Sequence, residues 1–302
     1  MNYRFDFLKS AKPMLVLSSV LVALSVLLVV FPAALGGGLP FGLNPGLDFT
    51  GGTQLRLQFA SDVSTESLRA TLSNIEVGGA DLSRSAIHDF PDLVNTKAVR
   101  MQLTDEGDID TVVEGIKAAF PNVKVISREV IGGQISKELV TSGWQSTILV
   151  LVVMLLYLSW RFQFRFAVGA VVALIHDVLI ALGMFALLHI EINLPVIAAF
   201  LTIVGYSVND TIVIFDRVRE NMVSHRRGDP YHLINLSLNQ SLRRTMHTSL
   251  TTFLPVLVLT LFGGSVLFAF AFALLMGVVV GTYSSIYVAS SLVLFWTKKT
   301  AT

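Results

Sequence analysis

The stretch Leu194–Phe215, LPVIAAFLTIVGYSVNDTIVIF, is long and apolar enough to cross a membrane, and it carries a carboxylate, Asp210, near its end. The preceding residue, Asn209, is also polar. An ionised carboxylate in hydrocarbon costs at least about 2.5 kcal/mol. We therefore expect Asp210 to be paired, to face a wet interior, or to take up and release a proton. The stretch predicts a membrane protein that is coupled to protons.

The composition of the whole chain agrees with this prediction. Of its 302 residues, 53% are hydrophobic and 14% are charged, whereas soluble domains carry about 25% charged residues. The net charge of +1 argues against a protein that binds nucleic acid. The lack of cysteine excludes disulfides, thiolate catalysis and cysteine metal sites.

Six apolar runs have about the length of a transmembrane helix, ~20 residues. They are Pro13–Phe31, Leu139–Ser159, Phe166–Leu188, Leu194–Phe215, Thr245–Phe262 and Val266–Trp296. The first could also be a secretory signal peptide, because small residues follow it at Ala33 and Ala34. Its apolar run exceeds the ~7–15 residues of a signal-peptide core. This length favours a retained first transmembrane helix over 13–35.

Lys and Arg residues occur in alternate connections between these runs. The connections that contain them are residues 1–12, Arg161–Arg165, the basic segment 216–244 and residues 298–302. The short connections His189–Asn193 and Gly263–Ser265 contain neither. The positive-inside rule therefore predicts a multi-pass protein of the bacterial cytoplasmic membrane with both termini in the cytoplasm. Residues 36–137 are then periplasmic, and residues 138–297 hold helices two to six.

The basic segment 216–244 is predicted to be a cytoplasmic loop. Asp229 followed by Pro230 is a helix start, with Leu233 and Leu236 at helical spacing behind it. An amphipathic helix that lies on the inner surface, attracted to anionic membrane lipid, explains the basic residues.

Residues 36–137 have the length and pattern of one small α+β domain. Strand-like alternation recurs at Gln54–Phe59, Ala80–Ile87, Val99–Leu103 and Val123–Val130, and helical spacing follows the capping residues Ser64 and Asp108. The resulting order, βαββαβ, is that of the ferredoxin-like sandwich. This fold leaves one face of its sheet free for a partner.

A glycine-rich entry, Gly46-Leu47-Asp48-Phe49-Thr50-Gly51-Gly52-Thr53, precedes the first strand of this domain. A phosphate-binding loop would open a helix, so its context argues against that function. We interpret Gly46, Asp48, Gly51 and Gly52 as a structural motif, a tight and conformationally permissive joint between membrane and domain.

Three further polar residues are candidates for a proton pathway. Asp177 lies near the middle of the third run, Arg244 stands at the start of the fifth near the level of Asp210, and Thr248 lies one turn deeper. A carboxylate that faces a guanidinium stays ionised, and withdrawal of the guanidinium favours protonation. Such a pair is a two-state element that proton occupancy can drive. A static ion pair, or arginines that only mark the cytoplasmic edge, is the alternative.

Several motifs resemble, in the same order, those of the SecF branch of the SecD/SecF family, within the RND superfamily of transporters. They are Gly46–Thr53, His176-Asp177, Ser207–Thr211 running into Phe215–Asn221, and Arg244-Thr245. The resemblance covers nearly the whole chain. It implies an α-helical membrane protein whose six transmembrane helices form half of a twelve-helix unit, with the ferredoxin-like domain between helices one and two.

The resemblance also implies a function: an accessory subunit of the Sec protein translocase, and not an enzyme. Members of this family use the proton-motive force to promote preprotein export, beside the SecYEG translocon and together with SecD. The preprotein would meet the periplasmic domain, and protons would be the coupling ion, with no cofactor. The family's proton pathway carries over to Asp210, Arg244 and Thr248, with Asn209 as neighbour. Asp177 either joins this relay or makes a structural polar contact.

Two other functions compete with this one. A stand-alone RND-type exporter of lipids or small molecules would normally need twelve spans in one chain or a homodimer. An intramembrane aspartyl protease would use Asp177 and Asp210 together. Such proteases resemble one another in a Gly-x-Gly-Asp motif, where this chain has Ser207-Val208-Asn209-Asp210. The depths estimated for the two carboxylates, one central and one near the inner edge, also argue against a shared catalytic water.

Overall fold

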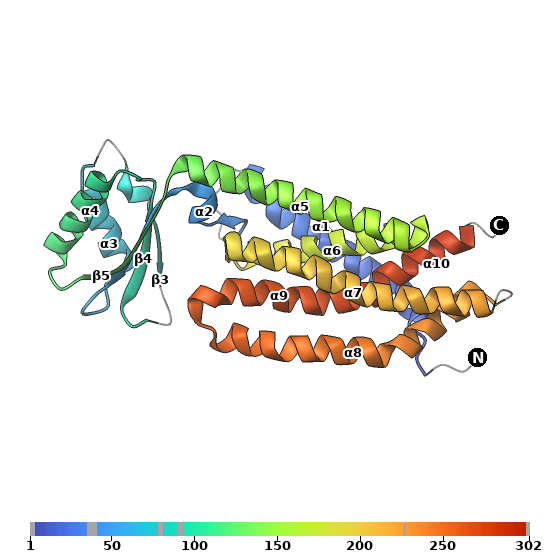
Figure 1. The fold of residues 1–302 in the computed structure, drawn as a ribbon. Coiled ribbons are helices and arrows are strands. Elements are labelled where there is room, and N and C mark those ends of the chain that lie inside the picture. Colours follow the sequence, from blue (N-terminus) through green and yellow to red (C-terminus); the bar gives the residue numbers. More distant parts are fainter. Residues whose placement is uncertain (1–3, 35–40, 78–80, 90–92, 226–227, 300–302) are drawn as a thin grey trace. The chain divides into compact units, whose positions relative to one another are not determined.

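The computed structural model describes residues 4–34, 41–77, 81–89, 93–225 and 228–299 (Figure 1). The described chain divides into two compact units. The first, which we call the membrane unit, comprises Met1–Asn44 and Gln145–Thr302. The second, the inserted domain, comprises Pro45–Trp144.

Within the described residues, six helical segments are long and apolar enough to cross a membrane, as predicted. Their elements are η1 (Leu8–Ser10) continued by α1 (Ala11–Ala34), α5 (Gly133–Arg161), α6 (Phe164–Leu187), α7 (Leu194–Ser224), α8 (Pro230–Phe262), and α9 (Gly264–Ser284) continued by η3 (Ser285–Ala289) and α10 (Ser290–Lys299). Two-residue strands β1 (Asn44–Pro45) and β6 (Glu191–Ile192) are the shortest elements.

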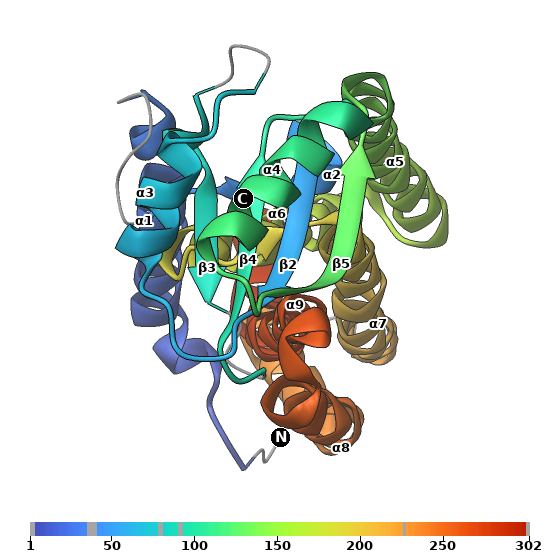
Figure 2. The ribbon, with the colours of Figure 1, turned by 90° about the vertical axis from the view of Figure 1, so that its left-hand side faces the viewer.

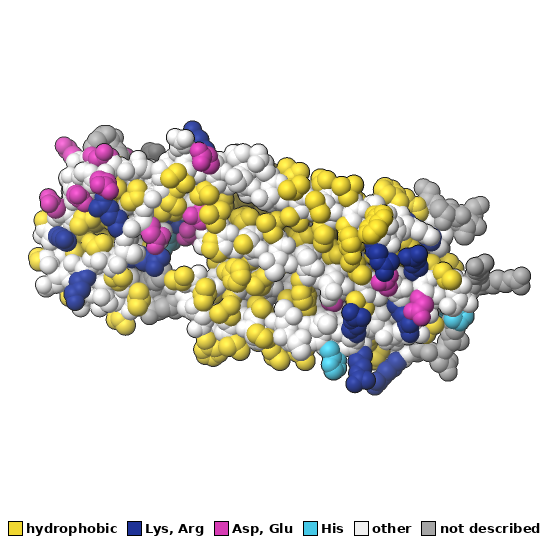
Figure 3. All heavy atoms as spheres, in the orientation of Figure 1, with side chains coloured by type: hydrophobic (Ala, Val, Ile, Leu, Met, Phe, Trp, Pro, Cys, Tyr) yellow, Lys and Arg dark blue, Asp and Glu magenta, His cyan; other side chains and the backbone are white. Residues whose placement is uncertain are grey.

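Helices α6 and α7 form the centre of the membrane unit. In the most apolar stretch of each helix, 56% of the residues of α6 and 50% of those of α7 are buried, whereas none is buried in the corresponding stretch of α5. Figure 3 shows hydrophobic side chains over the exposed helices on one face, with Lys and Arg side chains gathered toward the C-terminal ends of α5 and α7. The exposed apolar surface is suited to contact lipid or another membrane helix. Because the outward faces of these helices are apolar as well as the inward ones, their mean hydropathy is high enough to identify them from the sequence.

The described part of the basic segment 216–244 is mostly helical. The helix predicted to start at Asp229-Pro230 begins there, but it is continuous with the fifth membrane helix instead of being part of a separate loop. Helix α7 continues to Ser224, and α8 begins at Pro230, where the Asp229 side chain accepts a hydrogen bond from the Tyr231 amide. Buried Leu233, Ile234 and Leu238 on α8 pack with Ile214 and Val218 on α7. Because both extensions are amphipathic and pack on each other, they prolong the membrane helices instead of lying separately on a surface.

The last membrane helix packs against α7 through glycines. A Cβ atom at Gly277 would lie 2.1 Å from the Ile203 side chain, and one at Gly281 would lie 3.1 Å from Ser207. Such small residues allow two helix backbones to approach closely. The close approach brings the hydroxyl-bearing end of α9 next to the polar part of α7.

The inserted domain has the predicted order of elements. After the single turn α2 (Leu47–Thr50) come β2 (Gly52–Gln58), α3 (Thr65–Ser73), η2 (Leu82–Arg84), β3 (Ala86–Asp89), β4 (Thr96–Met101), α4 (Glu106–Ala119) and β5 (Lys124–Ile131). The four long strands form one antiparallel sheet in the order β3-β4-β2-β5 (Figure 2). This is the split arrangement of the ferredoxin-like sandwich.

The core of this domain lies between the sheet and its two helices. Leu55 on β2, Leu68 on α3 and Ile109 on α4 are fully buried in one hydrophobic cluster. One detail of the prediction is wrong: Asp105, not Asp108, caps α4, and its side chain accepts from the amides of Gly107 and Asp108. The predicted strand Ala80–Ile87 begins at 86 as β3, and residue 80 lies outside the described residues.

The glycine-rich entry forms one helical turn that leads into β2. Gly46 precedes the turn, and Gly51 and Gly52 follow it with φ of +67° and +106°. A Cβ atom at Gly52 would lie 2.2 Å from the Met101 carbonyl oxygen. Both the backbone angle and the close approach require glycine. The two glycines thus fix the start of β2 against β4.

Replacing Gly52 by alanine should destabilise the inserted domain by about 3 kcal/mol, because it adds backbone strain and a clash with β4. Gly132→Ala is the matched control, since a Cβ atom there would meet nothing within 4 Å. Thermal unfolding of the full-length chain, followed by protease resistance of the inserted domain, measures the difference. Equal resistance in the two variants would contradict this account.

Candidate functional site

Two carboxylates lie buried inside the membrane unit, and each has its own set of polar partners. Asp177 on α6 is 0% exposed and Asp210 on α7 is 1% exposed. Within the described residues, no hydrogen bond joins one carboxylate to the direct partners of the other. The two sites therefore need separate descriptions.

Asp210 accepts hydrogen bonds from two neighbouring hydroxyls of α8. Thr248 Oγ1 lies 3.3 Å from Oδ1, and Ser249 Oγ lies 3.3 Å from Oδ2. Ser249 also contacts Thr282 of α9 at 2.7 Å between their hydroxyl oxygens. The site thus gathers side chains from three helices around one carboxyl group.

These hydroxyls have other acceptors that compete for their protons. Thr248 also lies 3.1 Å from the Arg244 carbonyl and 2.9 Å from the Thr245 carbonyl, and a hydroxyl has one proton to give. Both contacts to Asp210 are long for O–H···O bonds, whose usual distance is about 2.7–2.8 Å. A hydroxyl can also accept a hydrogen bond. The same partners can therefore serve an ionised carboxylate, by donating, or a protonated one, by accepting.

The predicted ion pair between Asp210 and Arg244 is not formed among the described residues. Arg244 is exposed on α8, one turn before Thr248, and no ion pair within 4.0 Å links it to Asp210. Arg244 lies at the edge of the contact between α7 and α8, where its long side chain reaches solvent. Thr248 is where the prediction put it, against the carboxylate.

Asn209 points away from this site. It is exposed, whereas Asp210 and Thr211 beside it are buried. Successive helical residues are rotated by about 100°, so Asn209 faces the outside of the membrane unit. The structure does not bring it together with Thr248 or Arg244.

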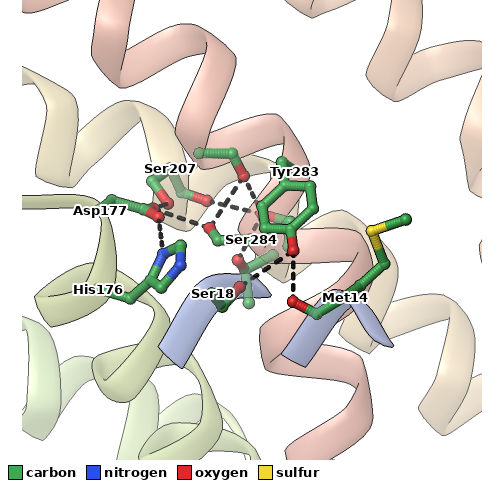
Figure 4. Close-up of polar contacts among 10 residues, drawn as sticks. Met14, Ser18, His176, Asp177, Ser207, Tyr283 and Ser284 are labelled. Atoms are coloured by element: carbon green, nitrogen blue, oxygen red, sulfur yellow. Dashed lines mark hydrogen bonds and ion pairs between the residues drawn. The ribbon is translucent and has the colours of Figure 1, made fainter. Parts of the chain in front are cut away.

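Asp177 is held by three shorter hydrogen bonds (Figure 4). Its Oδ1 lies 2.9 Å from His176 Nδ1, and its Oδ2 accepts from Ser207 at 2.6 Å and from Ser284 at 2.8 Å. These partners come from α6, α7 and α9. Asp177 therefore joins three helices at one point.

This network continues to α1 through Tyr283. The Tyr283 ring stacks on His176 with centroids 6.2 Å apart, and its hydroxyl donates to the Met14 carbonyl at 2.7 Å (Figure 4). Ser18 lies 3.0 Å from the same hydroxyl. The Asp177 network thus extends through four helices, including the first.

Along α7 the two carboxylates lie about one turn apart. Ser207, which binds Asp177, precedes Asp210 by three residues on α7, a rise of about 4.5 Å. The separate hydrogen-bond networks also argue against a protease that would use both carboxylates. Asp177 is enclosed by its own partners, His176, Ser207 and Ser284.

Several site residues escape the sequence reasoning. Ser249, Ser207 and Ser284 bind the two carboxylates, yet serine is common in membrane helices and makes local bonds there. Ser207 opens the motif Ser207–Thr211, but nothing in the motif assigns it to Asp177, and the sequence signal for Ser249 is its position beside Thr248. Within the described ranges, no group of three or more His, Asp or Glu side chains could hold a metal ion.

Comparison with known families gives two matches along the chain. Residues 111–299 match the family described as protein export membrane protein SecD/SecF, C-terminal. Residues 41–63 match the SecD/SecF GG motif. The second match covers the glycine-rich entry and the start of β2.

Curated relatives cover most of the chain. Protein translocase subunit SecF of Rhodobacter capsulatus is 38% identical over 85% of this chain and 81% of its own length. SecF of Vibrio alginolyticus is 42% identical over 83% and 80%. Protein translocase subunit SecDF of Thermus thermophilus is 41% identical over 87% of this chain but 36% of its own length.

Solved structures agree with these relatives. The crystal structure of the translocon-associated membrane protein SecDF from Thermus thermophilus matches with a TM-score of 0.86 at 36% identity, over 98% of this chain and 39% of that chain. SecDF in a super-membrane-facing form matches with a TM-score of 0.67, over 100% and 40%. By family match, identity and fold together, the chain belongs to the SecD/SecF family of protein export membrane proteins.

Proposed function

We propose that this chain is the SecF subunit of a Sec protein translocase, which uses the proton-motive force, together with SecD, to promote preprotein export. The observation that carries the proposal is Asp210. It is buried in α7, bound by two long contacts to hydroxyls and without an ion-pair partner within 4.0 Å among the described residues. A carboxyl group in such surroundings can gain and lose a proton without breaking a fixed ion pair.

The proposed cycle uses the two kinds of partner in turn. When Asp210 is protonated, its O–H donates to a hydroxyl oxygen of Thr248 or Ser249, and the site is neutral. When Asp210 is ionised, the charge attracts Arg244 from the edge of α8. Movement of Arg244 toward the carboxylate would shift α8 against α7. Proton occupancy is thereby converted into a change of helix packing.

The partnership with SecD is supported by the fused relative. This chain corresponds to 39% of the SecDF chain of known structure, so the remainder is free to supply the second half of the unit. On α7, the small or polar residues Thr202, Gly205 and Asn209 are exposed at helical spacing. In a monomer they would face lipid. A second six-helix unit would cover this face of α7.

We propose further that both termini are cytoplasmic and the inserted domain is periplasmic. Arg161 at the end of α5, Arg217 and Arg219 in the last part of α7, and Arg243 and Arg244 in the first half of α8 support this orientation through the positive-inside rule. In that orientation the inserted domain would meet the preprotein as it leaves the SecYEG translocon. The stand-alone exporter is not favoured, since the relatives compared are named as translocase subunits.

Asp210→Asn tests the proposal directly. It keeps the size and hydrogen bonding of the side chain but removes titration. We expect normal membrane insertion and co-purification with SecD, with export falling to the level seen without a gradient. Asp216→Asn is the control, because Asp216 is a half-exposed carboxylate on the same helix that pairs with Arg161 at the surface. Full gradient-dependent export by Asp210→Asn would show that Asp210 carries no proton.

Arg244→Lys tests the second half of the cycle. Lysine keeps the charge but loses the planar, multi-donor guanidinium, so partial gradient-dependent export is expected. Added to Asp210→Asn, it should cause no further loss, because the carboxylate that it serves is gone. Arg243→Lys, the neighbouring exposed arginine, should have little effect in either background. Independent, additive defects of Arg244→Lys and Asp210→Asn would contradict the interaction.

For Asp177 we propose a structural role in holding the helices together, and not a role in the proton pathway. Its three short hydrogen bonds tie α6, α7 and α9 together. A carboxylate that accepts three short hydrogen bonds can hold helices together, but it is poorly suited to carry a proton, because a change of protonation would disturb all three bonds at once. Asp177 would then hold the helices in the register that Asp210 requires.

Ser207→Ala and Ser284→Ala should therefore each lower the free energy of unfolding by about 1–3 kcal/mol, because each leaves Asp177 one donor short. The ratio of export with and without a gradient should stay unchanged at a temperature where the variants are folded. Thr251→Val is the control, since Thr251 is exposed and its hydroxyl bonds only to its own helix. A changed ratio with unchanged stability would place Asp177 in the relay.

A further inference from the structure

The N-terminal segment Phe5–Leu8 is clasped to α8 by two asparagine side chains. Asn235 accepts from the Phe7 amide at 2.9 Å and donates to the Phe5 carbonyl at 3.1 Å. Asn239 accepts from the Phe5 amide at 2.9 Å and donates to the same carbonyl at 2.7 Å. Asn235 is 0% exposed. The side-chain amide of Asn235 therefore holds the N-terminal segment in place.

The clasped segment closes a narrow hollow next to the Asp210 site. The hollow is lined by Phe7, Ile214, Leu238, Leu242, Thr245 and Ile286. It has no room for a water molecule. Ile214 follows Asp210 by one turn of α7, and Thr245 precedes Ser249 by one turn of α8. The hollow therefore adjoins the carboxyl site on the side from which the N-terminal segment approaches.

One polar atom in this hollow has no hydrogen-bond partner among the described residues. Thr245 is 1% exposed, and its hydroxyl is unpaired. Other threonines of α8, such as Thr252 and Thr260, donate to a carbonyl of their own helix. A buried, unpaired hydroxyl is unfavourable. Thr245 is thus suited to bind a water molecule whenever the hollow widens.

The hollow also borders the one turn of π-helix found in the described residues, η3. Ile286 of η3 lines it, and the neighbouring Tyr287 ring meets the Phe7 ring edge-on, with centroids 6.4 Å apart. Single π turns occur mostly as local bulges, frequently at functional sites. Three elements that can shift, the N-terminal segment, α8 and η3, therefore meet at this point.

We propose that the N-terminal segment is a gate on the water path to Asp210. With the segment clasped by Asn235, the Phe7 side chain forms one wall of the narrow hollow and separates Asp210 from that end of the membrane unit. Release of the segment opens the hollow and lets water reach Asp210 along the Thr245 hydroxyl. The proposal rests on the proposed role of Asp210 as a proton carrier, which requires access from one side at a time.

Cysteine accessibility in the full-length chain, assembled with cysteine-free SecD in inverted membrane vesicles, tests the gate. The chain has no cysteine of its own, so Thr245→Cys introduces a single thiol at the hollow. A membrane-impermeant maleimide should label it slowly when Phe7 and Asn235 are intact. Phe7→Ala or Asn235→Ala should raise the labelling rate by about tenfold, because each removes a contact that keeps the hollow closed. Phe7→Leu, which keeps the bulk, should leave the rate low.

A second thiol separates opening of the gate from general loosening. Ala273 of α9 is 0% exposed and does not line the hollow. Ala273→Cys should stay unlabelled in every background. Equal rates at Thr245→Cys with and without Phe7→Ala would overturn the gate. So would a parallel rise at Ala273→Cys, because the variants would then simply loosen the helix bundle.

Proton flux distinguishes failure of the gate from failure of the carrier. In proteoliposomes of the same complex, Phe7→Ala should raise passive proton flux, and adding Asp210→Asn should remove the increase. If labelling at Thr245→Cys rises but flux does not, the gate stands and the carrier role of Asp210 fails. If labelling does not rise while Asp210→Asn still abolishes gradient-dependent export, the gate fails and the proposed function stands.

Discussion

Hydrocarbon offers no water to a polar group, so each carboxyl, hydroxyl and amide inside the membrane must find its partner in the protein. Both carboxylates of the membrane unit follow this constraint, and the buried hydroxyl of Thr245 is an exception. The buried polar side chains of this unit lie on α1 and from α6 to α10, and the partners of the two carboxylates come from α6, α7, α8 and α9. The glycines of α9 have the same purpose, since the close approach at Gly277 and Gly281 brings Thr282 and Ser284 within reach of the two carboxylate sites.

The same constraint is met in two different ways by Asp177 on α6 and Asp210 on α7. Asp177 receives three hydrogen bonds of 2.6–2.9 Å, and those bonds join α6 to α7 and α9. Asp210 receives two contacts of 3.3 Å from hydroxyls that have competing acceptors. The hydrogen bonds of Asp177 hold helices together, whereas Asp210 is buried with only long contacts to its partners. An ionisable group of the second kind inside a membrane is costly, and this cost is the physical ground for the proposed role of Asp210.

Much of this fold could be predicted from the sequence, because the signals are strong and local. Hydropathy identifies six spans, and alternation with capping residues identifies the βαββαβ domain. The sequence predicts the helix start at Asp229-Pro230, but not that α7 continues to Ser224 or that α8 runs on into the membrane helix, because packing between α7 and α8 determines this. The same holds for the carboxylate partners. Asp210 is conspicuous in an apolar run, but Ser249 and Ser284 become site residues only through the rotation of helices that meet far apart in sequence.

The chemistry of the partners explains why hydroxyls rather than cations surround Asp210. A guanidinium fixed beside the carboxylate would stabilise one protonation state and oppose the other. A hydroxyl donates to the ionised form and accepts from the protonated form, so Thr248 and Ser249 can serve Asp210 in both states of the proposed cycle. In that cycle the cation lies at the edge, as Arg244 does, close enough to respond to the charge and free enough to withdraw. The hydroxyls then keep the carboxyl group bound, and the approach and withdrawal of Arg244 is the step that would shift α8 against α7.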